Sequence, residues 1–298
     1  MTTRRSFLGL ASCALAGCAS RVPCHHAVGR PSYHLFSRSF TEMDFDRLSA
    51  CAAEAGYDGV EWAVRPTRGH IVPDAAKTEL PKAAAAVRRQ GLSNVMLVTA
   101  FERPDESYCA EVFRVAADCG FTKIRIGYQQ YDAKESVSQS LARIHRNFAG
   151  FSELGLKTGV QAQFQNHDAW NDKVFGSAVW DAAEALEDVD PRGMAMQYDV
   201  HHAFFQTRNV WTHGFDRVAD RIGSFVLKDG QRSPTGGRKN CPAGAGVVPF
   251  KAFRERARLR GVPTVPFSVH MEYYAYKDQK DVVDTLRKEL DWFKGVFG

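Results

Sequence analysis

The sequence predicts a (β/α)8 barrel, an α/β fold in which eight parallel strands alternate with helices in a single domain. Three observations indicate this fold. From residue 32 on, short β-rich runs alternate with amphipathic runs of helical spacing, and eight such pairs fit into about 265 residues, the usual size of the barrel. Several helical runs end in a glycine, which the left-handed C-cap of a helix prefers. No GxGxxG motif follows the first strand, as an open dinucleotide-binding sheet would favour.

The expected elements follow one another in order along the chain. Runs rich in β-branched and aromatic residues predict strands over residues 33–37, 59–62, 95–99, 123–126, 158–164, 194–199, 224–228 and 265–272. Apolar residues at helical spacing predict helices over residues 44–55, 75–90, 106–119, 136–153, 178–186, 215–221, 250–260 and 281–293. Because no internal repeat or low-complexity segment interrupts the alternation, we expect one domain.

The first residues predict an export signal. Arg4 and Arg5 precede an apolar run over residues 7–16, which is shorter than the roughly 20 residues that span a bilayer. The run ends in Leu15-Ala16-Gly17-Cys18, which resembles the lipobox of bacterial lipoproteins, in which the cysteine carries the lipid. We expect residues 1–17 to be a twin-arginine lipoprotein signal, residues 18–31 a tether and residues 32–298 the barrel, anchored in the periplasm through Cys18. The alternative is a cytosolic chain that happens to begin with an apolar run.

Charge and cysteine content exclude several classes of protein. The net charge of +5 is modest, and no block of Lys and Arg is present that would bind a phosphate backbone, which argues against nucleic acid as a partner. The seven cysteines form no CxxC pair, which argues against a zinc knuckle and a disulfide framework. An oxidising compartment would permit one disulfide, whose partners the sequence does not identify.

Polar side chains gather at the expected C-terminal ends of the strands, where the active site of such a barrel lies. Strand alternation places Gln165 on the same face as His167, and His270 on the same face as Glu272. Buried charges are costly unless they are paired or used in function. The full set is Glu61, Arg125, Gln165, His167, Asp199, His202, Lys228, His270 and Glu272. We expect these residues to form a functional site.

The order and spacing of these motifs resemble the xylose-isomerase-like sugar phosphate isomerase/epimerase superfamily over about residues 32–295. The motifs are Gly56-Tyr57-Asp58-Gly59-Val60-Glu61, Gln165-Asn166-His167, Gln197-Tyr198-Asp199-Val200-His201-His202, Val226-Leu227-Lys228-Asp229, Gly244-Ala245-Gly246-Val247-Val248-Pro249-Phe250 and Ser268-Val269-His270-Met271-Glu272-Tyr273. The resemblance implies one divalent metal bound by Glu, Asp, His and Glu on strands five to eight. It also implies that two glutamates move a proton next to a sugar carbonyl.

The family's metal ligands carry over only in part. Asp199 and Glu272 match the aspartate and the second glutamate, whereas Gln165 replaces the first glutamate and Val226 replaces the histidine. Glutamine offers an oxygen without charge, and valine offers no ligand, so the expected set (Asp199, Glu272 and Gln165) is a poor one for a transition metal. A divalent ion such as Mn, Mg or Zn therefore stays an open expectation, and the two-glutamate shuttle is lost.

The resemblance implies an enzyme that abstracts a proton next to the carbonyl of a carbohydrate. We expect Glu272, Lys228 or His202 to act as the base, with Glu61, Arg125, His167 and His270 contacting the substrate. Structural roles are the alternatives. Glu272 would then form an ion pair with Lys228 or Arg125, and Asp199 would only accept a hydrogen bond that orients His202. Lys228 fits a structural role equally well.

Three functions stay open at this point. Isomerisation and epimerisation of a sugar begin with this proton abstraction, and so does β-elimination of an oxidised glycoside by a lyase. Export favours sugars without phosphate. A third reading is a lipid-anchored sugar-binding protein without catalysis, which Gln165 and Val226 support.

Overall fold

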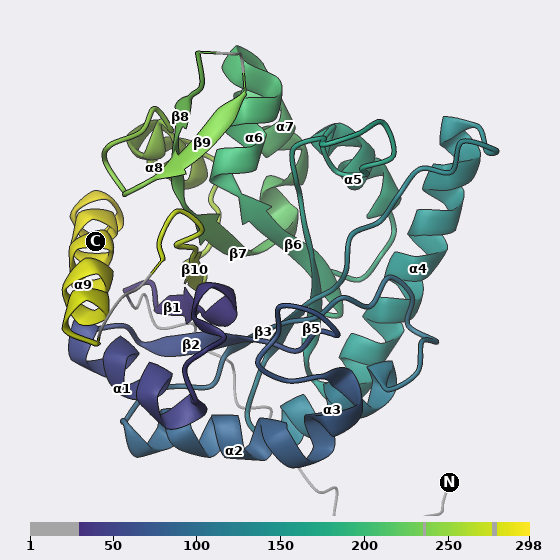
Figure 1. Ribbon diagram of the computed structural model, residues 1–298. Helices are drawn as coiled ribbons and strands as arrows, with labels where there is room; N and C mark the ends of the chain where they lie inside the picture. The colour runs from purple at the N-terminus through teal and green to yellow at the C-terminus, as the bar shows by residue number, and fades with distance from the viewer. Residues whose placement is uncertain (1–29, 235–236, 276–278) are drawn as a thin grey trace, which may run out of the picture.

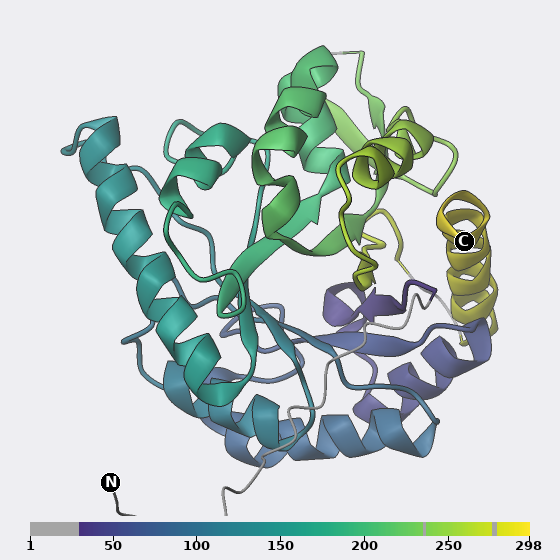
Figure 2. The same ribbon diagram turned by 180° about the vertical axis from the view of Figure 1, so that it is seen from behind.

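The computed structural model describes residues 30–234, 237–275 and 279–298. Within them, eight parallel strands close into a barrel in the order β1-β10-β7-β6-β5-β4-β3-β2, and helices surround it (Figures 1 and 2). The predicted (β/α)8 barrel is therefore confirmed. The expected signal peptide, Cys18 and nearly all of the expected tether lie outside the described residues.

Each barrel strand matches one of the predicted strands. The strands are β1 (Tyr33–Phe36), β2 (Gly59–Ala63), β3 (Met96–Val98), β4 (Lys123–Arg125), β5 (Gln161–Gln165), β6 (Met194–Asp199), β7 (Ile222–Leu227) and β10 (Phe267–Val269). The eighth was predicted too long at both ends, by two residues before Phe267 and three after Val269. Beyond Val269 it has no partner on one side, because β1 turns into a 3₁₀ helix at Ser37. His270 and Glu272 therefore lie on the connection that follows β10.

The helices form the outer layer of the barrel (Figure 1). They are α1 (Phe45–Ala55), α2 (Ala76–Arg89), α3 (Cys109–Asp118), α4 (Val137–Thr158), α5 (Val179–Ala185), α6 (Val200–Thr207), α7 (Trp211–Val218), α8 (Phe250–Leu259) and α9 (Gln279–Phe297). Sequence patterns explain their ends: Asp44 accepts a hydrogen bond from the Arg47 N–H at the start of α1, and Gly56 ends that helix in the left-handed region at a φ of 92°.

Two elements were not predicted. Helix α6 follows β6 without a loop, because the Asp199 side chain caps its first turn by accepting the His202 N–H. A hairpin of β8 (Asp229–Arg232) and β9 (Arg238–Cys241) leaves the barrel directly after β7. Both elements lie at the C-terminal ends of β6 and β7, so they add side chains to the mouth of the barrel.

The apolar core lies between the barrel and its helices. Large side chains on the outer faces of the strands, among them Trp62, Phe164 and Tyr198, are fully buried there. The inside of the barrel is more polar: Gln197 and Ser268 both donate hydrogen bonds to the buried Glu61. This interior forms the floor under the C-terminal mouth.

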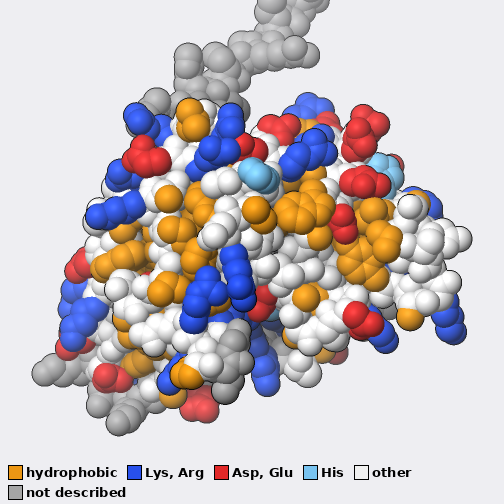
Figure 3. Space-filling model, turned by 90° about the horizontal axis from the view of Figure 1, so that it is seen from above, with side chains coloured by type: hydrophobic (Ala, Val, Ile, Leu, Met, Phe, Trp, Pro, Cys, Tyr) orange, Lys and Arg blue, Asp and Glu red, His pale blue; other side chains and the backbone are white. Residues whose placement is uncertain are grey.

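The surface and the cysteines can be described for part of the chain. On the face shown in Figure 3, basic side chains are interspersed with acidic and apolar ones. Among the described residues, no helix combines the length and apolar content needed to cross a membrane. The four cysteines within the described ranges, Cys51, Cys109, Cys119 and Cys241, are free thiols.

Candidate functional site

Asp199 lies at the centre of the polar cluster at the C-terminal mouth. It ends β6 and is completely buried. Its Oδ1 accepts the backbone N–H of His202 at 3.0 Å, while Oδ2 accepts the amide of Gln165 at 2.7 Å and lies 3.2 Å from Lys228 Nζ. Burial alone would raise the pKa of this carboxyl, but the groups around it, His202 and Lys228 foremost, lower it well below its usual range. Asp199 is therefore an ionised, fully paired carboxylate.

Gln165 links Asp199 to the next charged residue. Its Oε1 accepts a hydrogen bond from the Arg125 guanidinium, and its Nε2 donates to Asp199. Arginine can only donate and a carboxylate can only accept, so these two partners fix the orientation of the amide. Gln165 therefore presents no free oxygen to the site.

Lys228 follows β7 and lies between the two carboxylates that the sequence singled out. Its Nζ lies 2.8 Å from His202 Nε2, 3.2 Å from Asp199 Oδ2 and 3.3 Å from Glu272 Oε2. Although burial alone would lower the pKa of this buried ammonium, Asp199 and Glu272 outweigh it and raise the pKa. The lysine is thus held protonated by its neighbours.

Glu272 differs from the other acids in its access to solvent. Its side chain is 21% exposed, whereas that of Asp199 is at 0%. It accepts hydrogen bonds from Arg38 at 3.0 Å, from Lys228 at 3.3 Å and from Asn240 at 3.3 Å. Burial would raise the pKa of this carboxyl, but Lys228 and its other cationic neighbours lower it. Glu272 therefore faces the mouth as an ionised carboxylate with cations on both oxygens.

Glu61 and His270 lie deeper than the sequence analysis expected for residues that contact a substrate. Both are buried, and His270 Nε2 is 3.7 Å from a Glu61 oxygen. The His270 ring stacks on Phe36 with a centroid distance of 4.2 Å, and burial lowers its pKa. These two residues form the floor of the site beneath Glu272.

A second carboxylate group lies on the loop after β5. Asp168 Oδ1 is 2.5 Å from His202 Nδ1 and 3.0 Å from His167 Nδ1, and Arg238 of the hairpin contacts both of its oxygens. The centroids of the His167 and His202 rings lie 3.6 Å apart. Burial lowers the pKa of His202 to about 3, so this imidazole is neutral. His167 is the more accessible of the two histidines.

The expected divalent metal does not fit the residues assigned to it. Gln165 offers no free oxygen, Val226 offers no ligand, and the Lys228 ammonium contacts both remaining carboxylates. Two other groups of side chains bring ligand atoms within 4.8 Å of one another, namely His167, Asp168 and His202, and Asp199, His201 and His202. In both groups the His202 nitrogens already contact Asp168 and Lys228. A metal would have to displace these contacts.

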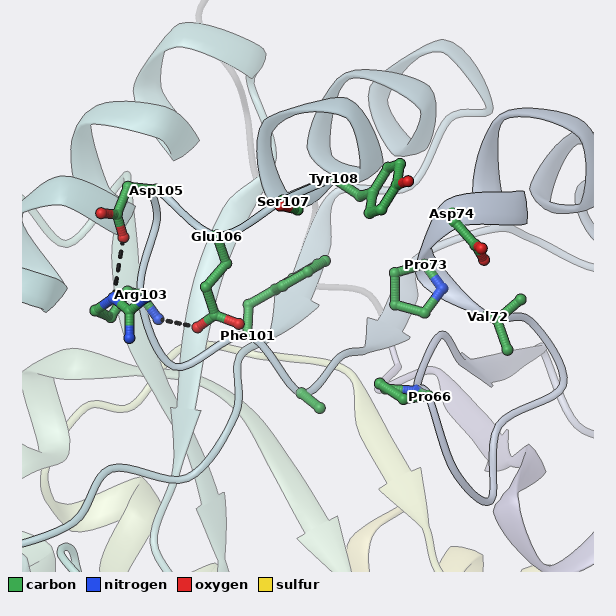
Figure 4. Close-up of a pocket in the computed structure, with 11 residues that line it drawn as sticks. Pro66, Val72, Pro73, Asp74, Phe101, Arg103, Asp105, Glu106, Ser107 and Tyr108 are labelled. Atoms are coloured by element: carbon green, nitrogen blue, oxygen red, sulfur yellow. Dashed lines mark hydrogen bonds and ion pairs between the residues drawn. The ribbon is translucent and has the colours of Figure 1, made fainter.

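The rim of the mouth is hollowed on the side of β2 to β4. One cavity of about 450 Å³ is lined by Arg38, Tyr128 and residues of the loops after β2 and β3. It shares Pro66 and Ala100 with a larger cavity of about 690 Å³, whose lining Figure 4 shows. Arg38, which lines the smaller cavity, also binds Glu272, so this cavity lies near the exposed carboxylate.

Sequence reasoning missed four residues of the site. Arg38, Asp168 and Asn240 contact the predicted set, and Arg238 contacts Asp168. None of them ends a barrel strand: they come from the 3₁₀ turn after β1, the loop after β5 and strand β9 of the hairpin. Asp168 alone carried a signal, since it directly follows Gln165-Asn166-His167.

Several solved structures share this architecture. A D-psicose 3-epimerase crystallised in the presence of D-fructose aligns with a TM-score of 0.68 at 11% identity, covering 90% of this chain and 99% of that chain. The 3-keto-D-glucoside 4-epimerase from E. coli aligns with a TM-score of 0.66 at 13% identity over 89% and 100%. The probable 3-DHS dehydratase from Bacillus anthracis aligns with a TM-score of 0.63 at 15% identity over 86% and 97%. At these identities, the likeness shows the fold alone.

Sequence comparison gives the family directly. No curated protein matches the chain. The sequence model of the xylose isomerase-like TIM barrel, however, matches residues 50–296, which is most of the chain. The chain therefore belongs to the xylose isomerase-like TIM barrel family.

Proposed function

We propose that the protein is a sugar isomerase or epimerase that abstracts the proton next to the carbonyl of a carbohydrate, with Glu272 as the base. The observation that carries this proposal is the position of Glu272. Of the three carboxylates Glu61, Asp199 and Glu272, it alone has an appreciably exposed side chain, and cations lie against both of its oxygens. Proton abstraction next to a carbonyl creates an oxyanion, which such cations stabilise.

The neighbours of Glu272 have separate roles in binding the substrate and positioning the site. When a substrate carbonyl oxygen takes hydrogen bonds from Arg38 and Lys228, these cations are partly withdrawn from Glu272, which becomes more basic as the substrate binds. Lys228 was one of the three bases expected from the sequence. Because its neighbours hold it protonated, it supplies positive charge instead of accepting a proton. His202 contacts Asp168 through Nδ1 and Lys228 through Nε2. Its role in the proposal is therefore to position these two side chains.

His167 is the second group suited to proton transfer. Its Nδ1 contacts Asp168, and its ring lies at the mouth beside Tyr128 and Trp170. A carboxylate at one nitrogen orients the imidazole and leaves the other nitrogen to give or take a proton. In isomerisation or epimerisation this group would return a proton to the substrate, and in β-elimination it would protonate the oxygen of the leaving aglycone.

The two adjoining cavities favour a glycoside as substrate and keep a lyase as the second candidate. Their volumes of about 450 and 690 Å³ leave room for an aglycone as well as a sugar, and Arg38 joins the smaller cavity to Glu272. In a keto-glycoside, loss of the proton is followed by β-elimination of that aglycone. Anchoring in the periplasm through Cys18 is part of the proposal and agrees with a substrate without phosphate.

The test follows the proton itself. Purified protein is incubated in D₂O with free ketoses or 3-keto-glycosides, and NMR records deuterium at the carbon next to the carbonyl and any release of the aglycone. We expect Glu272→Gln to reduce exchange by roughly 10²- to 10⁴-fold. The exposed Glu255→Gln on α8 is the control and should exchange like the wild type. Tight sugar binding without exchange would refute the enzyme and favour the sugar-binding protein.

A further inference from the structure

We propose that the ammonium group of Lys228 is the resident cation of this site, in the place that a divalent metal would fill between Asp199 and Glu272. The two carboxylates that resemble metal ligands approach one common point, and Nζ occupies it at 3.2 Å from Asp199 and 3.3 Å from Glu272. His202 Nε2 completes the set at 2.8 Å. An ammonium has three N–H donors and no acceptor, so these three acceptors satisfy it completely.

Two positions at which the resemblance implies metal ligands, Gln165 and Val226, supply none. Gln165 stands where the family has a glutamate, and its amide is turned so that N–H, not oxygen, faces Asp199. Arg125 fixes this orientation by binding the amide oxygen. Val226 on β7 offers no ligand where the family has a histidine. A metal needs three or four ligands at about 2.0–2.3 Å. This leaves Asp199, Glu272 and His202, and Lys228 contacts all three of them.

The charges of the cluster balance without a metal. Four carboxylates are matched by four cationic side chains, each in an ion pair, hydrogen bond or ring contact within the mouth: Glu61, Asp168, Asp199 and Glu272 against Arg38, Arg125, Lys228 and Arg238. A divalent ion would add two positive charges to a largely buried site, next to an ammonium. Uncompensated charge in such a place is costly. The lysine therefore excludes the metal as well as replacing it.

Lys228 also supplies a fixed positive charge beside Glu272, the carboxylate that faces the mouth, as a bound divalent ion would. This part of the inference rests on the proposed function, because it places the developing oxyanion beside Lys228 and Arg38. The exclusion of metal does not rest on it and is tested separately. A failure to find the substrate would thus leave the result on metal binding untouched.

The experiment compares metal binding in the wild type and in two variants of Lys228. Lys228→Ala removes the charge and opens space, so that Asp199, Glu272 and His202 surround an empty point. Lys228→Met removes the same charge but fills the space, and it is the matched control. Each protein is incubated with Mn²⁺ or Zn²⁺ and desalted. The bound metal is measured by elemental analysis, and the melting temperature is recorded with and without each ion.

We expect the wild type to retain well below one ion per chain and to melt at the same temperature with ions or chelator. We expect Lys228→Ala to bind about one ion and to be stabilised by it, since a ligand that binds the folded state raises its stability. Lys228→Met should bind none. A stoichiometric ion in the wild type that disappears in Glu272→Gln would overturn the proposal. So would a Lys228→Ala protein that keeps the wild-type melting temperature and takes up no ion.

Discussion

Arg238 forms a bidentate ion pair with Asp168, 70 positions away in the sequence. Its Nε lies 2.7 Å from one carboxylate oxygen and its Nη2 lies 2.9 Å from the other. This bidentate ion pair connects strand β9 of the hairpin to the loop after β5. Burial would raise the pKa of Asp168, but His167, His202 and Arg238 lower it strongly. The hairpin thereby helps to orient both histidines at the mouth.

Arg238→Lys should lower turnover without unfolding the protein. Lysine keeps the charge but cannot bind both oxygens in one plane, so Asp168 and the two histidines lose their fixed orientation. Misplacement of catalytic groups by about 1 Å can cost roughly 10²-fold in rate. Steady-state kinetics should show the loss in kcat rather than in KM. Arg232→Lys on the same hairpin is the control, and equal losses in both variants would refute the specific role of Arg238.

Replacing Asp229 should destabilise the loop before α8. Its carboxylate accepts backbone N–H groups of Gly230, Gly244, Gly246 and Val248 at 2.8 to 3.3 Å. Asp229→Ala leaves these four donors without their acceptor, and we expect the free energy of unfolding to fall by about 3 kcal/mol or more. Urea unfolding measures the change. The exposed Asp220→Ala should leave the midpoint where it is, and a wild-type midpoint for Asp229→Ala would contradict the assignment.

Glu289 should make the stability of the protein fall as the pH rises. Burial raises the pKa of this carboxyl on α9 to about 7 from its usual 4.5, only partly offset by hydrogen bonds from Ala243 and Tyr273. Because the folded state binds the proton more tightly, the stabilisation is complete below pH 4.5 and is lost as the pH rises to about 7. The loss amounts to about 3 kcal/mol at most.

Glu289→Gln tests this dependence, since its amide oxygen accepts the same two hydrogen bonds and cannot ionise. Urea unfolding between pH 5 and 8 should give a smaller decline for the variant than for the wild type. If both decline in parallel, Glu289 does not titrate in this range.

Glu272 should have the opposite effect on stability. Its pKa in the folded protein is lowered, so its pairs with Lys228 and Arg38 stabilise the fold above the usual pKa of 4.5, and this contribution disappears as the pH falls. The difference in unfolding free energy between the wild type and Glu272→Gln should therefore be largest near neutral pH and vanish in acid. A difference that does not change with pH would indicate lost packing rather than lost charge.

The sequence predicts the barrel better than it predicts the site. Strand periodicity and glycine caps depend on local backbone preferences, and all eight barrel strands overlap the predicted ranges. Asp199, Lys228 and Glu272 were also identified, because they follow strands whose ends must meet. Of their partners, Lys228 for Glu272 and His202 for Asp199 were named among the alternatives, whereas Arg38 was not. Arg38 and Arg238 reach the mouth through a turn and a hairpin whose positions depend on tertiary packing, and no local pattern encodes that Nζ of Lys228 lies between two carboxylates.

The polar floor inside the barrel has a consequence for how this chain can change. Gln197 and Ser268 both donate to Glu61, and Ser224 donates to Gln163 beside them. Loss of any one member leaves another polar group buried without a partner, which costs more than the lost bond itself contributes. We therefore expect these positions to change only through several substitutions made together. A laboratory library that varies them one at a time would therefore recover almost only the starting sequence.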